Sequence, residues 1–132
     1  MEQTLTSPAC TSEPQTHSDT TKTRRIRDLN DLFRRGTIEV SQALGRKYMT
    51  SGITGLGLPT CIEIGKKVMQ FDDFSEDNNP FEEHDFGSFK HDGHTIFWKI
   101  DYYTPDLKHG SPDPSDPGVT SRVLTVMLAS EY

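Results

Sequence analysis

One histidine and one aspartate between residues 84 and 101 form the pair in this chain best suited to acid–base chemistry. His84 and Asp101 face each other in the hairpin predicted below, and a carboxylate at that distance can orient an imidazole as a general base. Ser88 is on the same face as His84 but two pleats away, too far for a direct hydrogen bond. We therefore interpret the pair as a cross-strand ion pair and assign no catalytic residue.

Asp85 is predicted on the apolar face of the same hairpin, opposite Ile100. A carboxylate there must be paired, hydrogen-bonded or shifted in pKa, and we expect it to cap the N-terminus of a nearby helix. With His84 and Asp101 it makes up the set on which a small hydrolase or metal-dependent enzyme would be built.

The predicted hairpin turn carries a partial metal-binding set. His91 and His94 face each other beside it, and Asp92 lies between them. Histidines beside a tight turn are usually solvated, and the spacing indicates no further ligand. We therefore predict no metal and no cofactor.

Six carboxylates before the hairpin are the largest deviation in the sequence: Asp72, Asp73, Glu76, Asp77, Glu82 and Glu83. They lack the alternating oxygen pattern and the turn glycine of an EF-hand loop, which argues against calcium. Such a cluster is tolerable when it is solvated or matched by a cationic partner. These six residues are our candidate partner-binding set.

Charge is unevenly distributed along the 132 residues, whose net charge is −6. Six basic residues lie between Lys22 and Arg35, whereas the 46 residues from Phe71 to Asp116 carry twelve acids and three lysines. This layout disfavours direct nucleic-acid binding and favours a protein partner that is itself basic, such as a nucleic-acid-binding complex.

The composition predicts one domain, residues 23–132, behind a disordered polar tail at residues 1–22. No stretch is long and apolar enough to span a membrane, and the first residues lack the pattern of a secretion signal, so we expect a cytoplasmic protein. Cys10 and Cys61 are expected to be free thiols.

Periodicity predicts two helices in the first half of the domain. The first runs from Arg25 to Arg35, and the second begins at Pro59 and ends at Asp72. Their expected apolar stripes are Ile26, Leu29, Leu32 and Phe33 in the first, and Cys61, Ile64, Val68 and Phe71 in the second. Glycines interrupt every period between them, although residues 46–51 are compatible with a short strand.

The clearest signal is a β-hairpin of residues 84–91 and 94–103 around Asp92-Gly93. A two-residue turn fixes the register, so that Phe89 faces Ile96 and Gly87 faces Trp98. A proline-rich loop, 104–117, follows. Residues 119–132 fit either a helix or a β-branched strand, and we favour the helix because Asp116-Pro117 resembles a cap and first turn. The fold expected is a small α+β domain with this central hairpin packed by two or three helices.

Several motifs carry a family resemblance: Phe71-Asp-Asp-Phe-Ser-Glu-Asp-Asn-Asn-Pro80, Glu83-His-Asp-Phe-Gly-Ser-Phe89, Phe97-Trp-Lys-Ile-Asp-Tyr-Tyr103, Ser111-Pro-Asp-Pro-Ser-Asp-Pro117 and Arg122-Val-Leu-Thr-Val-Met-Leu-Ala-Ser-Glu-Tyr132. In these the chain resembles a bacterial family of unknown function, most strongly from about residue 59 onward. The family occurs in proteobacteria, often on plasmids and prophage-like elements. The resemblance therefore implies a mobile-element accessory protein and no established activity.

Two functional hypotheses follow from these features. The first, which we favour, is a non-enzymatic protein of a mobile genetic element that blocks a host defence factor, of CRISPR or restriction type, by presenting its acidic surface to a nucleic-acid-binding groove. The alternative is the small hydrolase or metal-dependent enzyme that uses His84, Asp85 and Asp101.

Overall fold

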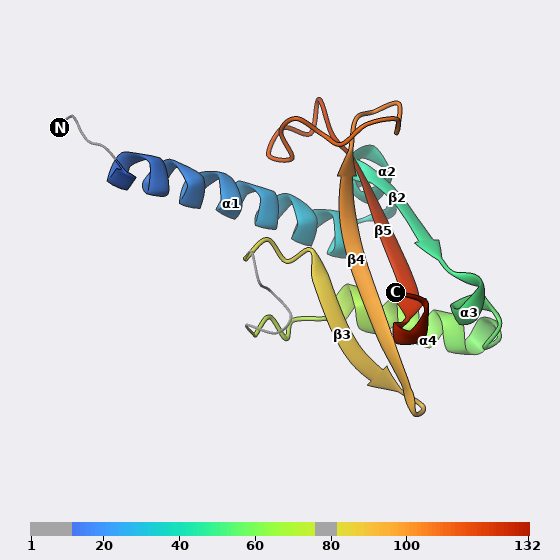
Figure 1. Ribbon diagram of the computed structural model, residues 1–132. Helices are drawn as coiled ribbons and strands as arrows, with labels where there is room; N and C mark the ends of the chain where they lie inside the picture. The colour runs from blue at the N-terminus through green and yellow to red at the C-terminus, as the bar shows by residue number, and fades with distance from the viewer. Residues whose placement is uncertain (1–11, 76–81) are drawn as a thin grey trace.

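The computed structural model describes residues 12–75 and 82–132, which form a small α+β domain around a four-stranded sheet (Figure 1). The order of strands is β2-β5-β4-β3, with β2 parallel to β5 and the other neighbours antiparallel. The elements are α1 (Ser12–Arg35), α2 (Ile38–Leu44), β2 (Gly45–Met49), α3 (Ser51–Thr54), α4 (Leu58–Gln70), β3 (Phe86–His91), β4 (His94–Tyr103), β5 (Ser121–Leu128) and the 3₁₀ turn η2 (Ala129–Glu131).

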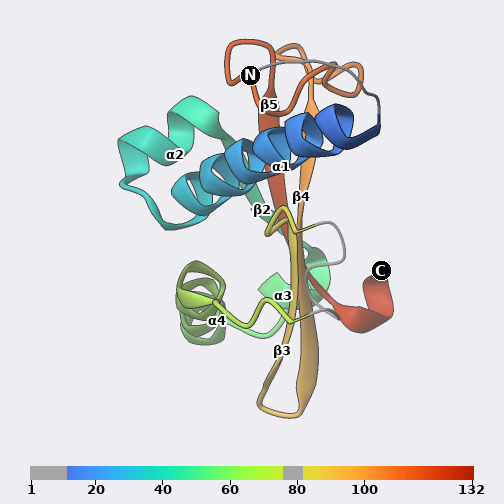
Figure 2. The same ribbon diagram turned by 90° about the vertical axis from the view of Figure 1, so that its left-hand side faces the viewer.

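The helices and the sheet form two layers with the core between them. Figure 2 shows α4 and the C-terminal part of α1 on one side of the sheet and η2 on the other. Helix side chains such as Phe33, Ile64 and Val68 pack there on Trp98 of β4 and Val126 of β5. No helix in the described part of the chain is both long and apolar enough to cross a membrane.

Helix α1 starts earlier than the periodicity predicts, and of its predicted stripe Ile26 and Phe33 are buried and Leu29 packs against the core. It begins at Ser12, so residues 12–22 are helical where we expected a disordered tail, and residues 1–11 lie outside the described residues. Leu32, expected in the apolar stripe, is 47% exposed, whereas Asn30 and Arg34 are completely buried beside Phe33. The helix thus places two polar side chains in the interior.

The second helix and the hairpin confirm the sequence analysis. Ile64 and Val68 of α4 are buried as expected, and every predicted pair from Phe86↔Lys99 to His91↔His94 is present. A Cβ on Gly87 would collide with the Trp98 indole, so only a glycine lets the ring lie across β3. The turn at Asp92-Gly93 has positive φ at both residues, +48° and +81°, as a two-residue hairpin loop requires.

The C-terminal segment is a strand, and the helix that we favoured is wrong. Ser121–Leu128 forms β5, which lies in the middle of the sheet between β2 and β4. Burial alternates along β5, with Arg122, Leu124 and Val126 buried on one face and Met127 on the other. Asp116-Pro117, which we interpreted as a helix cap and first turn, instead belongs to a turn in which Asp116 Oδ1 accepts from Gly118 N at 2.8 Å.

The glycine-rich segment between the two predicted helices holds three short elements. The expected short strand is present as β2, and α2 and α3 flank it. Gly45 opens β2 where a Cβ would collide with the carbonyl oxygen of Arg122 in β5. Here glycine permits the close approach of two parallel strands rather than interrupting the fold.

Candidate functional site

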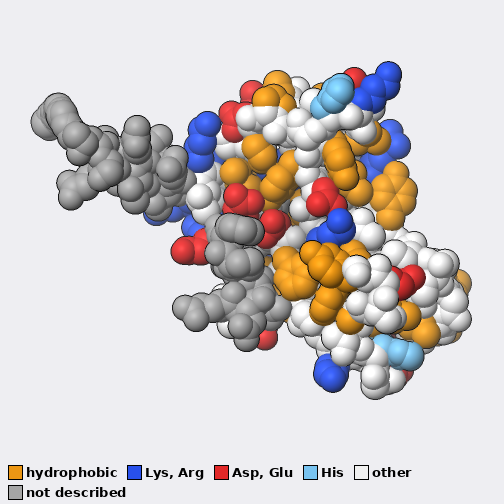
Figure 3. All heavy atoms as spheres, viewed as in Figure 1, with side chains coloured by type: hydrophobic (Ala, Val, Ile, Leu, Met, Phe, Trp, Pro, Cys, Tyr) orange, Lys and Arg blue, Asp and Glu red, His pale blue; other side chains and the backbone are white. Residues whose placement is uncertain are grey.

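The acidic segment between α4 and β3 is the candidate partner-binding region. Asp72 and Asp73 follow α4 and are exposed, and so is Glu82 before β3. Figure 3 shows acidic side chains gathered where α1 passes the start of β3. Glu76 and Asp77 lie outside the described residues. We refer to the exposed carboxylates Asp72, Asp73 and Glu82 together as the acidic side.

Glu83, predicted with this set, is half-buried and takes part in a hydrogen-bond network within the domain. Its Oε1 accepts a hydrogen bond from the Tyr102 hydroxyl at 2.8 Å, and its carbonyl oxygen accepts one from Asn30 Nδ2 at 3.0 Å. Asn30 also accepts from Arg122 Nε at 2.6 Å, and it donates to the Tyr102 hydroxyl at 2.8 Å. Burial, together with the charge of Glu83, raises the pKa of Tyr102 well above its usual range. This network joins α1, β4 and β5.

The chain brings His84 to Asp31 of α1. His84 Nδ1 lies 2.9 Å from Asp31 Oδ1, and the ring stacks on Phe74 at 3.6 Å between centroids. Asp101 instead pairs with Lys99 at 2.9 Å. The physical reason is the backbone: Glu82 and His84 both have positive φ, and β3 begins only at Phe86, so the predicted register ends before it reaches residue 84.

Asp85 behaves as a partly buried carboxylate, as expected, but caps no helix within the described residues. Its carbonyl oxygen accepts from Ile100 N at 2.8 Å, which extends the hairpin by one bond. Burial, reinforced by the negative charge of Glu83, raises the pKa of its carboxyl to about 6. The residue therefore changes charge near neutral pH.

Arg34 forms what we call the arginine clamp, a buried guanidinium that holds the end of α4. Its Nη1 donates to the carbonyl oxygens of Val68 at 2.7 Å and of Phe71 at 2.9 Å. The side chain is completely buried, and the guanidinium lies 4.8 Å above the Trp98 ring. Carbonyls at a helix C-terminus have no partner within the helix, so the clamp satisfies them. Burial, with the neighbouring charge of Arg35, lowers the pKa of Arg34 to about 10.

Most of the basic residues predicted between Lys22 and Arg35 also donate to main-chain oxygens, although of these only Arg34 is buried. Arg25 donates to the carbonyl oxygen of Ser115, Arg27 to that of Glu82, and Arg35 to that of Phe71. With Arg34, four of the six basic residues bond to main-chain oxygens of distant segments. They serve the packing of α1 against the rest of the domain.

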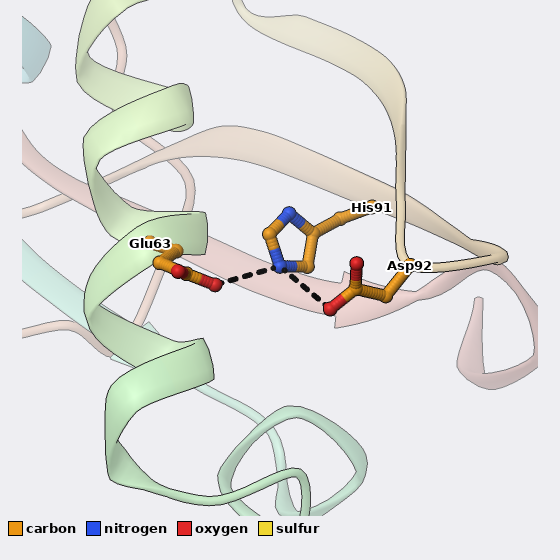
Figure 4. Close-up of side chains that lie close together, drawn as sticks. All are labelled: Glu63, His91 and Asp92. Atoms are coloured by element: carbon orange, nitrogen blue, oxygen red, sulfur yellow. Dashed lines mark ion pairs between the residues drawn. The ribbon is translucent and has the colours of Figure 1, made fainter.

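His91 occupies a second polar site, which we call the histidine site and define as His91, Glu63 and Asp92. Its Nε2 lies 3.2 Å from Glu63 Oε1 of α4 and 3.5 Å from Asp92 Oδ2 of the turn (Figure 4). The histidine is only 7% exposed, while both carboxylates reach solvent. Within the described part of the chain, neither ring nitrogen has a hydrogen-bond partner with acceptable alignment. His94, its predicted companion, is exposed across the turn.

Glu63 is the residue of this site that sequence reasoning missed. It lies 28 positions before His91 and shows no motif, because the contact depends on how α4 packs across the hairpin. Asp31, the partner of His84, was missed for the same reason.

Comparison with known protein families identifies the part of the chain that carries these sites. The family model for a protein of unknown function, DUF3768, matches residues 49–131. This chain belongs to the DUF3768 family. No curated protein and no solved structure matches it.

The DUF3768 match divides the molecule in an informative way. The acidic side and all three members of the histidine site lie within residues 49–131. Arg34, Asn30 and Asp31 of α1 lie before that range. The DUF3768 region thus contains both candidate binding sites, and α1 supplies the arginine that closes its core.

Proposed function

We propose that this protein is a non-enzymatic binding protein whose acidic side contacts a basic protein partner. The observation that carries the proposal is the unequal use of charge. Four basic side chains of α1 each donate to a main-chain carbonyl oxygen of a distant segment, and Arg34 is completely buried, whereas Asp72, Asp73 and Glu82 are exposed. A guanidinium held against a carbonyl oxygen of its own chain is less free to reach a phosphate, so α1 is a poorer nucleic-acid-binding surface than its basic residues suggest.

The same observation favours a protein partner over a nucleic acid. A nucleic-acid-binding surface needs several exposed cations in a row to neutralise phosphates. A groove built to hold phosphates has those cations, and it complements an acidic side in charge. Blocking such a groove is a direct way for a small protein to inhibit a nucleic-acid-binding factor.

The finer proposal is that the factor belongs to a host defence system and that this protein is encoded by a mobile genetic element. It rests on the resemblance of the C-terminal motifs to a family that occurs on plasmids and prophage-like elements. Such an element gains when a small accessory protein inactivates a CRISPR or restriction complex.

The alternative, an enzyme using His84, Asp85 and Asp101, has less support. His84 pairs with Asp31, and Asp101 pairs with Lys99, so the imidazole and the carboxylate of the predicted dyad have other partners. Aromatic stacking on Phe74 also covers a face of the imidazole.

The test is capture of partners from a bacterial host that carries defence systems, at low and high salt. Asp72→Lys and Asp73→Lys each reverse one charge of the acidic side and are tested alone and combined, and Glu39→Lys, an exposed acid of α2, is the control for a single reversal. We expect the wild type and the control to capture the same basic protein, and we expect capture to fall with salt and with added nucleic acid. Unchanged capture by the folded double variant, with no effect of salt, would refute the acidic side as the contact.

A further inference from the structure

The histidine site contains a buried imidazole, His91, that forms no hydrogen bond with any described residue of the chain. A polar group that is buried without a hydrogen-bond partner destabilises a fold. His91 is 7% exposed, and both of its nitrogens lack a hydrogen-bond partner within the described residues. Two carboxylates nevertheless converge on Nε2 from different elements. This combination points to a ligand between them.

We propose that Nε2 of His91, Oε1 of Glu63 and Oδ2 of Asp92 bind a divalent transition-metal ion such as Zn²⁺. The two carboxylates lie on either side of the nitrogen, and neither contact has the alignment of a hydrogen bond (Figure 4). Ligands that share one ion are arranged in this way, because the nitrogen lone pair points at the metal and the oxygens flank that direction.

The distances fit such an ion. Zinc bonds of about 2.0 to 2.2 Å put the ligand atoms of a tetrahedral site about 3.3 to 3.6 Å apart. The nitrogen lies 3.2 Å from the Glu63 oxygen and 3.5 Å from the Asp92 oxygen. All three ligand atoms lie within 4.8 Å of one another. Both carboxylate side chains are well exposed, at 61% and 75%, so they can close the remaining distance by rotation.

The donor set selects the class of ion. One imidazole and two carboxylates suit Zn²⁺, Co²⁺ or Mn²⁺, whereas Mg²⁺ and Ca²⁺ prefer sets made only of oxygen. Three protein ligands leave a fourth position for water or for a group from a partner. Nδ1 has no acceptor among the described residues, so the usual bond that orients a metal-binding histidine is missing. We therefore expect affinity in the micromolar range rather than tighter.

The ion would connect two elements that flank the acidic side. Glu63 belongs to α4, which ends just before Asp72, and His91 belongs to β3, which begins after Glu82. Metal at this site would fix α4 against the hairpin turn. The inference does not depend on the proposed partner, because the acidic side shares no residue with the histidine site.

The test is titration of the full chain, stripped of metal with a chelator, with Zn²⁺ by calorimetry and with Co²⁺ by visible absorption. We expect one ion per chain, a four-coordinate Co²⁺ spectrum, and no saturable binding of Mg²⁺. Glu63→Gln and Asp92→Asn each remove one exposed ligand without burying a new group, and each should weaken binding at least about tenfold. His94→Gln, across the same turn, is the matched control and should bind like the wild type.

Three outcomes would overturn the proposal. The first is the absence of saturable Zn²⁺ binding, which leaves the cluster as an ion pair. The second is unchanged affinity in Glu63→Gln, which places the ion elsewhere. The third is an equal loss in His94→Gln, which assigns the ion to the exposed turn.

Discussion

The arginine clamp and the histidine site are both buried polar side chains that contact α4, yet they are satisfied very differently. Arg34 donates to carbonyl oxygens at 2.7 and 2.9 Å, and only its Nε lacks a partner among the described residues. His91 has a hydrogen bond at neither nitrogen, although two carboxylates lie near it. A buried group with several strong hydrogen bonds stabilises the fold, whereas an imidazole with none at either nitrogen and two carboxylates beside it is a candidate ligand-binding group. The comparison therefore assigns a structural role to Arg34 and a ligand-binding role to His91.

The largest effect should come from breaking the clamp. Arg34→Met leaves the carbonyl oxygens of Val68 and Phe71 buried without this donor, and we expect the free energy of unfolding to fall by about 3 kcal/mol. Urea unfolding measures it, with Arg24→Met, an exposed residue of the same helix, as the control. A loss below about 0.5 kcal/mol would mean that the clamp carries no stability.

The histidine site should respond in the opposite direction. In protein stripped of metal at pH 8, His91→Leu replaces an unpaired polar group with an apolar one, so the free energy of unfolding should rise by about 1 kcal/mol. His94→Leu, on the exposed side of the turn, should change it by less than about 0.5 kcal/mol. Destabilisation by His91→Leu would show that its carboxylate contacts already satisfy the imidazole.

Asp85 is a third polar group, partly buried, and its effect on the free energy of unfolding should be smaller and should depend on pH. Its folded-state pKa of about 6 exceeds the unfolded value of about 4, so ionisation disfavours the folded state. The cost is absent below about pH 4, grows between pH 4 and 6, and is complete above. Asp85→Asn should therefore stabilise the protein at pH 8 by about 1 kcal/mol, after allowance for solvent screening, and have no effect at pH 4. Thermal unfolding at both values measures this; an equal effect at both would contradict it.

Local signals were enough to predict the hairpin and α4. Asp92-Gly93 fixes a register through its own turn geometry, and Ile64 and Val68 mark one face of a helix. The strand β5 was misread because Asp116-Pro117 resembles a helix cap, and we gave that local signal more weight than the alternation of Leu124, Val126 and Leu128. The correct predictions and the incorrect one all rested on signals from within a few residues of the element.

The sites could be predicted only in part for the same reason. The exposure of Asp72 and Asp73 follows from their charge, and His91 and Asp92 stand out beside the turn. Their partner Glu63 is fixed by the packing of α4 across the hairpin, and Arg34 looks like any solvated arginine in a basic run. Long-range contacts of charged side chains leave no period in the sequence.

The most direct test of the distinction between clamp and site is the stabilisation that Zn²⁺ gives to three proteins: the wild type, Arg34→Met and His91→Leu. At a free Zn²⁺ concentration about 100 times the dissociation constant, linkage predicts an increase of about 2.7 kcal/mol in the free energy of unfolding. We predict the same increase in the wild type and in Arg34→Met, whose site is intact, and none in His91→Leu. No increase in the wild type, or an equal increase in His91→Leu, would contradict the assignment of His91 as a metal ligand.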